Sequence, residues 1–196
     1  MNKIVLASKS PRRSEILGKF VENLIIDSLE IDEKINLEFS PQVNVMSLSL
    51  EKASGISKVY PEDIVIGSDT IVYYDGNILG KPIDYEDAFK MLRLLSGKTH
   101  SVYSGYAILK SSDNRKVVGY EETKVKFKEL TDETIEDYLN TEEYKGKAGA
   151  YAIQGYGAVL VENITGTYEN IVGLPISSID RDLNRIFDYS LLKGNK

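Results

Sequence analysis

The feature that most constrains the fold of this chain is a pair of long strand patterns on either side of a short polar turn. Residues 102–109 and 117–127 are rich in apolar and β-branched side chains, and the sequence SSDN at 111–114 separates them. From residue 123 to 128 the second arm alternates between side chains of strand type and lysines, the period of a half-exposed strand. The pattern predicts a long antiparallel hairpin, which argues against a purely parallel, doubly wound sheet.

Strand patterns alternate with helix signals along the rest of the chain. Residues 3–8 have the apolar character of a buried strand, and Ser10 then caps a predicted helix with Pro11 at its first position. Helix starts of the same kind are predicted at four later positions, namely Pro41, Asp84, Thr131 and Pro175. Helices and strands are therefore interleaved along the whole sequence.

A polar segment is expected at the end of a second buried strand. Residues 64–66 are apolar and run into the sequence GSDT at 67–70, and residues 71–74 then reach Asp75-Gly76, a strong hairpin signal. A later strand is expected over residues 158–161. Together these elements predict an α/β fold with a mixed sheet and flanking helices.

Length and composition suit one enzyme-sized domain. The chain has 196 residues, enough for one core or for one core that a cleft divides into two lobes. Repeats and linkers are not evident, so we expect a single domain over residues 1–196. We also expect a cytoplasmic protein without a membrane segment, and the net charge of −6 argues against broad binding to nucleic acid.

The inventory of reactive side chains excludes several kinds of chemistry. The chain has no cysteine and a single histidine, His100, which we expect to be structural. Disulfide scaffolds, thiolate metal sites and cysteine nucleophiles are therefore excluded, as is a three-histidine zinc site within one chain. Metal chemistry falls to carboxylates, whose oxygen atoms suit Mg²⁺ or Mn²⁺.

A phosphate site is predicted between the first strand and the first helix. Arg12 and Arg13 lie in the first helical turn, where the helix dipole disfavours each cation by about 0.3–1 kcal/mol. A bound anion would offset that cost, since free backbone amides, two guanidiniums and the hydroxyls of Ser8 and Ser10 suit a phosphate. The alternative is a pair of solvated surface arginines.

Two acidic positions are candidates for holding a metal ion or orienting water. Asp69 is expected at the end of a buried strand, although an aspartate in a turn often only bonds nearby backbone. Glu33 belongs to the pair Asp32-Glu33 after an extended run, and most such pairs are merely solvated.

Lysines and a glutamine complete the candidates. Lys81 follows Gly80, but three residues rather than four separate Gly76 from Gly80, so this is not a Walker motif. Lys52 and Lys81 can each reach a phosphate as a point charge, or be surface lysines. Gln154 lies in the glycine-rich segment 147–155, which is either a mobile connection or a means of presenting an amide to a base edge.

In this order, the segments resemble the Maf family of nucleoside triphosphate pyrophosphatases. The matching motifs cover nearly the whole chain: LASKSPRR at 6–13, DE at 32–33, EKA at 51–53, GSDT at 67–70, GKP at 80–82, LSGKTH at 95–100, KAGAYAIQG at 147–155 and VGLP at 172–175. The resemblance implies hydrolysis of a nucleotide to its monophosphate and pyrophosphate, with a divalent cation such as Mg²⁺ or Mn²⁺. It also implies an elongated α/β fold with a central cleft, similar to the inosine triphosphatases, and often a homodimer.

The resemblance also implies roles for single residues. Asp69 matches the family's catalytic acid/base and, with Glu33, its metal-facing carboxylates. Its phosphate-facing residues match Ser8, Arg13, Lys52 and Lys81. Its substrate-choice positions match Arg12, Thr70 and Gln154, and this trio resembles the branch that acts on dTTP and UTP rather than the branch that acts on methylated GTP.

Three functions follow from these observations. The leading one is a housekeeping pyrophosphatase that removes pyrimidine or modified nucleotides and binds only a small-molecule partner. The enzymatic alternative is the same reaction on purine triphosphates such as ITP or XTP. The non-enzymatic alternative is a regulator of cell division that binds nucleotide without turning it over.

Overall fold

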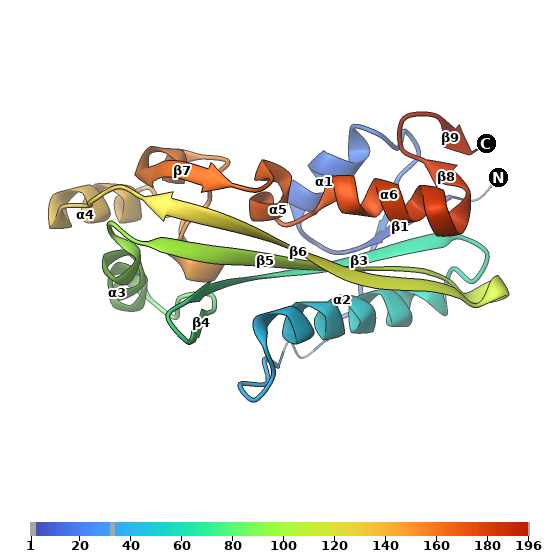
Figure 1. Ribbon diagram of the computed structural model, residues 1–196, viewed down its shortest axis with the longest axis horizontal. Helices are drawn as coiled ribbons and strands as arrows, with labels where there is room; N and C mark the ends of the chain where they lie inside the picture. Colours follow the sequence, from blue (N-terminus) through green and yellow to red (C-terminus); the bar gives the residue numbers. More distant parts are fainter. Residues whose placement is uncertain (1–2, 32–33, 196) are drawn as a thin grey trace. The chain divides into compact units, whose positions relative to one another are not determined.

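The computed structural model describes residues 3–31 and 34–195 (Figure 1). They fall into two compact units. Unit 1 consists of the described residues up to Asp69, of Ser104–Glu121 and of the described residues from Gly173 onward, and unit 2 consists of Thr70–Tyr103 and Glu122–Val172. The single domain over the whole chain and the central cleft stay predictions.

A mixed sheet contains most of the strands. Their bounds are β1 Ile4–Ala7, β2 Ile25–Asp27, β3 Ile64–Tyr74, β4 Asn77–Leu79, β5 Thr99–Lys110, β6 Arg115–Phe127 and β7 Val161–Thr165. The strand order is β2-β1-β3-β5-β6-β7, with β4 paired to β3. Strand β1 is parallel to β2 and to β3, whereas β4 and β7 are antiparallel to their partners. The predicted mixed sheet is therefore confirmed.

The helix starts predicted from the sequence are confirmed to within one residue. Their bounds are α1 Pro11–Gly18, α2 Pro41–Ser57, α3 Tyr85–Leu95, α4 Asp132–Asn140, α5 Tyr168–Val172 and α6 Ile176–Phe187. The Asp84 side chain accepts from the Asp87 N–H, and Thr131 accepts from the Thr134 N–H, as N-caps do. Ser10 precedes α1 but makes no side-chain cap bond, and its backbone N–H donates to the Ser8 hydroxyl.

Unit 1 is built around the parallel strands β1 and β3. Helices α1 and α6 cover one face of these strands and α2 covers the other (Figure 1). Both faces are thus buried, which explains why residues 4–7 and 64–66 are apolar without alternation. Seven buried residues form one cluster of this core: Val5, Ala7, Ala53, Ile56, Val65, Ala107 and Leu109.

Unit 2 contains the half-exposed end of the long hairpin. Thr123, Val125 and Phe127 of β6 are fully buried, and the residues between them face outward or are half-buried, as the alternation predicts. The turn Asp75-Gly76 has φ values of 47° and 83°, the positive values that a tight two-residue hairpin turn requires. The hairpin predictions are confirmed.

Two local predictions are wrong. The sequence GSDT at 67–70 does not end a strand, because β3 continues through it from Ile64 to Tyr74. Residues 158–160 belong to a 3-10 helix, η3 Tyr156–Leu160, and the strand begins only at Val161. In the described parts of the chain, no helix combines the length and apolar character needed to cross a membrane.

Candidate active site

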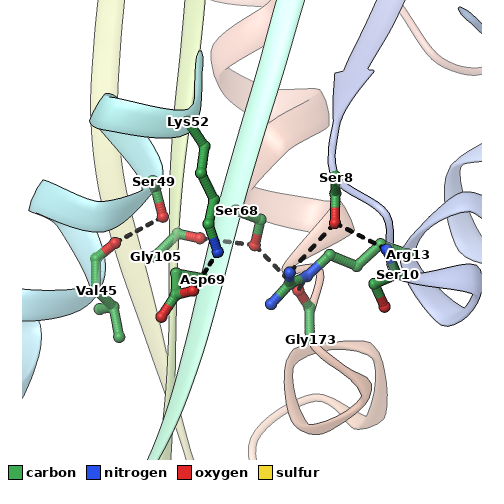
Figure 2. A network of polar contacts seen from close by, with 10 residues as sticks. All are labelled: Ser8, Ser10, Arg13, Val45, Ser49, Lys52, Ser68, Asp69, Gly105 and Gly173. Atoms are coloured by element: carbon green, nitrogen blue, oxygen red, sulfur yellow. Dashed lines mark hydrogen bonds and ion pairs between the residues drawn. The ribbon is translucent and has the colours of Figure 1, made fainter. Parts of the chain in front are cut away.

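The first part of the candidate site lies where β1 ends and α1 begins, in unit 1 (Figure 2). The Ser8 hydroxyl oxygen accepts a hydrogen bond from the Ser10 backbone N–H at 3.2 Å and another from Nη1 of Arg13 at 3.4 Å. Ser8 is buried, and Arg13 is half-buried in the first turn of α1. The hydroxyl therefore fixes both the loop and the guanidinium beside it.

A backbone carbonyl makes a second contact with Arg13. Nε of Arg13 donates to the Gly173 carbonyl oxygen at 2.7 Å. Bonds from two different nitrogens fix the plane of the guanidinium, and a fixed planar group is what bidentate recognition of phosphate oxygens needs. Arg13 is thus an ordered side chain rather than a solvated surface arginine.

Ser8 and Arg13 form the predicted phosphate cradle, and Ser68 joins this cradle to β3, the strand that carries Asp69. Its hydroxyl is fully buried and lies 2.8 Å from the Gly105 carbonyl oxygen and 3.0 Å from the Gly173 carbonyl oxygen. Gly173 therefore accepts from both Ser68 and Arg13 (Figure 2). Its φ of 117° is a conformation that residues with a side chain rarely adopt.

The second part of the site is an ion pair between α2 and β3. Nζ of Lys52 lies 2.5 Å from Oδ1 of Asp69, and the two side chains are only 12% and 10% exposed. Loss of one partner of such a buried pair leaves the other charge uncompensated, at a cost of about 3–5 kcal/mol. The pair holds a carboxylate and an ammonium in place within unit 1.

Two glycines bring α2 close enough for this pair to form. A Cβ on Gly67 would lie 2.4 Å from the Ser49 carbonyl oxygen, and one on Gly105 would lie 2.3 Å from the Val45 carbonyl oxygen. The Ser49 hydroxyl bonds back to the Val45 carbonyl at 2.6 Å, so it leaves no unsatisfied group at the contact. The close approach of helix to strand places Lys52 next to Asp69.

Comparison with known proteins decides the family. A model of the family described as Maf-like protein matches residues 3–186, nearly the whole chain. This chain belongs to the Maf family. The resemblance found in its motifs is confirmed.

Relatives of this Maf protein match it over nearly its full length. The dTTP/UTP pyrophosphatase of Pyrococcus furiosus is 49% identical over 176 residues, which cover 90% of this chain and 91% of the relative. The dTTP/UTP pyrophosphatase of Clostridioides difficile is 48% identical over 191 residues, which cover 97% and 98%. A solved structure of a nucleoside-triphosphatase / dITP/XTP pyrophosphatase from Mycobacterium abscessus has 17% identity and a TM-score of 0.42, over 65% of this chain and 75% of that chain.

The other predicted site residues of the Maf protein are distributed between the units. Arg12 is half-buried in the first turn of α1, in unit 1. Thr70 is half-buried on β3, while Lys81 and Gln154 are exposed, and all three belong to unit 2. Glu33, the predicted second metal ligand, lies outside the described residues.

Sequence reasoning missed the residues that join the two parts of the site. In the sequence, Ser68 stands out only as a neighbour of Asp69, and Gly173 only as part of a family motif. The hydrogen bond between Ser68 and Gly173 joins positions 105 residues apart, so no local sequence pattern predicts it. The one usable signal is that VGLP places a glycine shortly before Pro175, the predicted start of the last helix.

The described part of the site offers a divalent cation one buried carboxylate, that of Asp69. In residues 3–31 and 34–195, no group of three or more His, Asp or Glu side chains could hold a metal. Mg²⁺ does not need such a group, because it keeps several waters and uses one or two carboxylates together with substrate phosphates. The buried carboxylate of Asp69 fits that kind of binding, with one of its oxygen atoms bonded to Lys52.

Proposed function

We propose that this Maf protein is a nucleoside triphosphate pyrophosphatase that hydrolyses dTTP and UTP to the monophosphate and pyrophosphate. The structural observation that carries the proposal is the network of unit 1, in which Ser68 and Gly173 join Arg13 to the strand that bears Asp69. The names of the Pyrococcus furiosus and Clostridioides difficile relatives support the choice of substrate.

The proposed reaction is a direct attack of water on a phosphate, without a covalent enzyme intermediate. A water oxygen forms a bond to phosphorus, the bond to the bridging oxygen breaks, and pyrophosphate leaves with the electron pair of that bond. Asp69 orients the water and takes up its proton, and Arg13 and Lys52 neutralise the charge that collects on the phosphate oxygens. Because no covalent intermediate is needed, a chain without cysteine and with one buried histidine suffices.

We extend the proposal to a divalent cation, Mg²⁺ or Mn²⁺. Asp69 would hold it, and the family resemblance adds Glu33 as a second ligand. When bound, such an ion neutralises phosphate oxygens and supports the leaving group. We also propose a cytoplasmic location, as expected from the sequence, and, on the resemblance alone, a homodimer.

From the family resemblance, we propose that Arg12, Thr70 and Gln154 select the base. Uracil and thymine present an N3–H donor next to a carbonyl acceptor, and the Gln154 amide can accept from N3–H and donate to O4 at the same time. Cytosine reverses both groups, so the same amide orientation leaves polar atoms unpaired. The proposal therefore expects CTP to be a poor substrate.

A pyrophosphate-release assay tests the proposal with dTTP, UTP, CTP, ITP and XTP, each with Mg²⁺ or Mn²⁺. We expect dTTP and UTP to react fastest, and Asp69→Asn to lower their turnover about 10²–10⁴-fold. Asp137→Asn, at an exposed aspartate of α4, is the matched control and should stay at the level of the unaltered protein. Faster turnover of ITP or XTP, or near-native turnover by a folded Asp69→Asn variant, would refute the proposal.

A further inference from the structure

The segment of unit 2 that carries Gln154 is an ordered loop rather than a mobile connection. Gln154 is exposed, but its neighbour Ile153 is buried. Within this segment, Gly149 and Ala150 both have positive φ, at 67° and 60°, and the Gly149 N–H donates to the Gly80 carbonyl oxygen at 3.0 Å. The loop thus has a defined main-chain path on which one polar side chain points outward.

Aromatic residues hold the loop on the N-terminal side of Gln154. The Tyr151 hydroxyl bonds Nε2 of His100 at 2.8 Å, and the Ala152 N–H donates to the Tyr138 hydroxyl at 3.2 Å. The rings of His100, Phe127 and Tyr151 meet edge to face, with centroids 4.8–5.4 Å apart. Tyr151 is buried, so this side of the loop is part of the core of unit 2.

A single carboxylate holds the loop on the C-terminal side of Gln154. Oε1 of Glu143 accepts from the Tyr156 N–H at 3.0 Å, and Oε2 accepts from the Gly157 N–H at 2.9 Å. These amides open η3, where backbone donors lack partners within the helix. Bonds of this kind to an ionised group are about twice as strong as bonds between neutral groups.

Gly155 is required for the carboxylate to reach these amides. A Cβ on Gly155 would lie 1.7 Å from Oε1 of Glu143, so any side chain at this position would displace the glutamate. A residue with a side chain directly after Gln154 is therefore incompatible with this position of the Glu143 carboxylate. The pair of hydrogen bonds and the absence of a side chain at position 155 fit the same contact.

We propose that Glu143 is a positioning residue for base recognition, because it fixes the main chain from which Gln154 presents its amide. The inference rests on the proposed function, in which Gln154 reads the pyrimidine. A loop ordered before the substrate arrives loses less freedom on binding and keeps the amide where it discriminates between bases. Loss of the Glu143 bonds should therefore weaken discrimination as well as activity.

The test compares Glu143→Gln with Glu142→Gln in the full-length protein. The adjacent Glu142 is exposed and pairs with Lys145 at 2.6 Å, so it controls for loss of one glutamate charge at this site. We expect Glu143→Gln to lower kcat/KM for UTP by about 10- to 100-fold, the range for loss of hydrogen bonds to a charged group, and to lower kcat/KM for CTP much less. Glu142→Gln should leave the ratio of UTP to CTP unchanged.

A double-mutant cycle separates positioning from general stability. If Glu143 acts through Gln154, then Glu143→Gln should have almost no effect on UTP hydrolysis in a Gln154→Ala background. Gly155→Ala, which displaces the same carboxylate from the other side, should reproduce the loss of discrimination. An equal loss of activity on UTP and CTP, or fully additive effects in the cycle, would overturn the inference.

Amide hydrogen exchange gives a readout that does not depend on turnover. The Tyr156 and Gly157 amides should be protected in the unaltered protein and in Glu142→Gln, and should exchange faster in Glu143→Gln. If the unaltered protein hydrolyses no nucleotide, the proposed function fails. Hydrogen exchange still tests the separate claim that Glu143 holds the loop. Unchanged protection in Glu143→Gln would refute it.

Discussion

Replacing His100 tests whether the core of unit 2 is built as described. Burial lowers the pKa of His100 to about 4, from an ordinary value of 6.5, so the ring is neutral where it bonds Tyr151. Below pH 6.5 the unfolded chain takes up a proton at this position that the folded protein does not bind. Stability is therefore lost as the pH falls from 6.5 to about 4, and this contribution is constant above pH 6.5.

The size of the effect follows from that difference in pKa. A change from 6.5 to about 4 corresponds to about 3 kcal/mol when fully expressed, and most of it is expressed at pH 4.5. His100→Gln keeps an amide that can bond the Tyr151 hydroxyl but cannot take up a proton in this range. We expect the variant to be less stable than the unaltered protein at pH 7, because its side chain packs less well against Phe127.

The assay is urea unfolding of both proteins at pH 7 and at pH 4.5. Subtracting the two proteins cancels the many carboxylates that titrate in the same range. The stability advantage of the unaltered protein should shrink by about 2–3 kcal/mol between pH 7 and pH 4.5. A pH-independent difference between the two proteins would refute the assignment of His100 as a buried neutral group.

Three further predictions concern the candidate site. Arg13→Lys keeps the charge but not the planar fork, so kcat/KM for dTTP should fall about 10- to 100-fold, and unchanged kinetics would contradict the cradle. Ser68→Ala leaves two carbonyls without their shared donor and should cost about 1–3 kcal/mol in urea unfolding, whereas an unaffected midpoint would show that the hydroxyl is dispensable. Gly67→Ala places a Cβ 2.4 Å from the Ser49 carbonyl oxygen and should lower the free energy of unfolding by about 1–3 kcal/mol. Gly18→Ala is the control, because a Cβ there would have no atom within 4 Å. Equal melting temperatures for the two variants would contradict the close packing of α2.

The elements that could be predicted from the sequence are those whose signals are local. Asp84 and Thr131 cap their helices within three residues, and Asp75-Gly76 turns a hairpin within two. Ser8 and Arg13 are also close in sequence, so their contact was within reach of the pattern. In each of these cases the interacting groups lie within one turn or one loop of the chain.

The wrong predictions arose where distant residues change the meaning of a local sequence. GSDT at 67–70 has the composition of a turn, but Gly67 serves the approach of α2 and the Ser68 hydroxyl bonds the Gly105 and Gly173 carbonyls. Residues 158–160 have the side chains of a strand, but Glu143 binds amides at the start of the same segment and stabilises η3. Tertiary hydrogen bonds overrode local preference in both segments.

The measurement that tests the central claim most directly is identification of the products. Phosphorus NMR of dTTP incubated with the protein and Mg²⁺ distinguishes cleavage between the α and β phosphates from cleavage between the β and γ phosphates. We predict thymidine monophosphate and pyrophosphate in equal amounts from the first turnover, and about 10²–10⁴-fold slower formation of both products with Asp69→Asn. Thymidine diphosphate and inorganic phosphate as the first products would contradict the account.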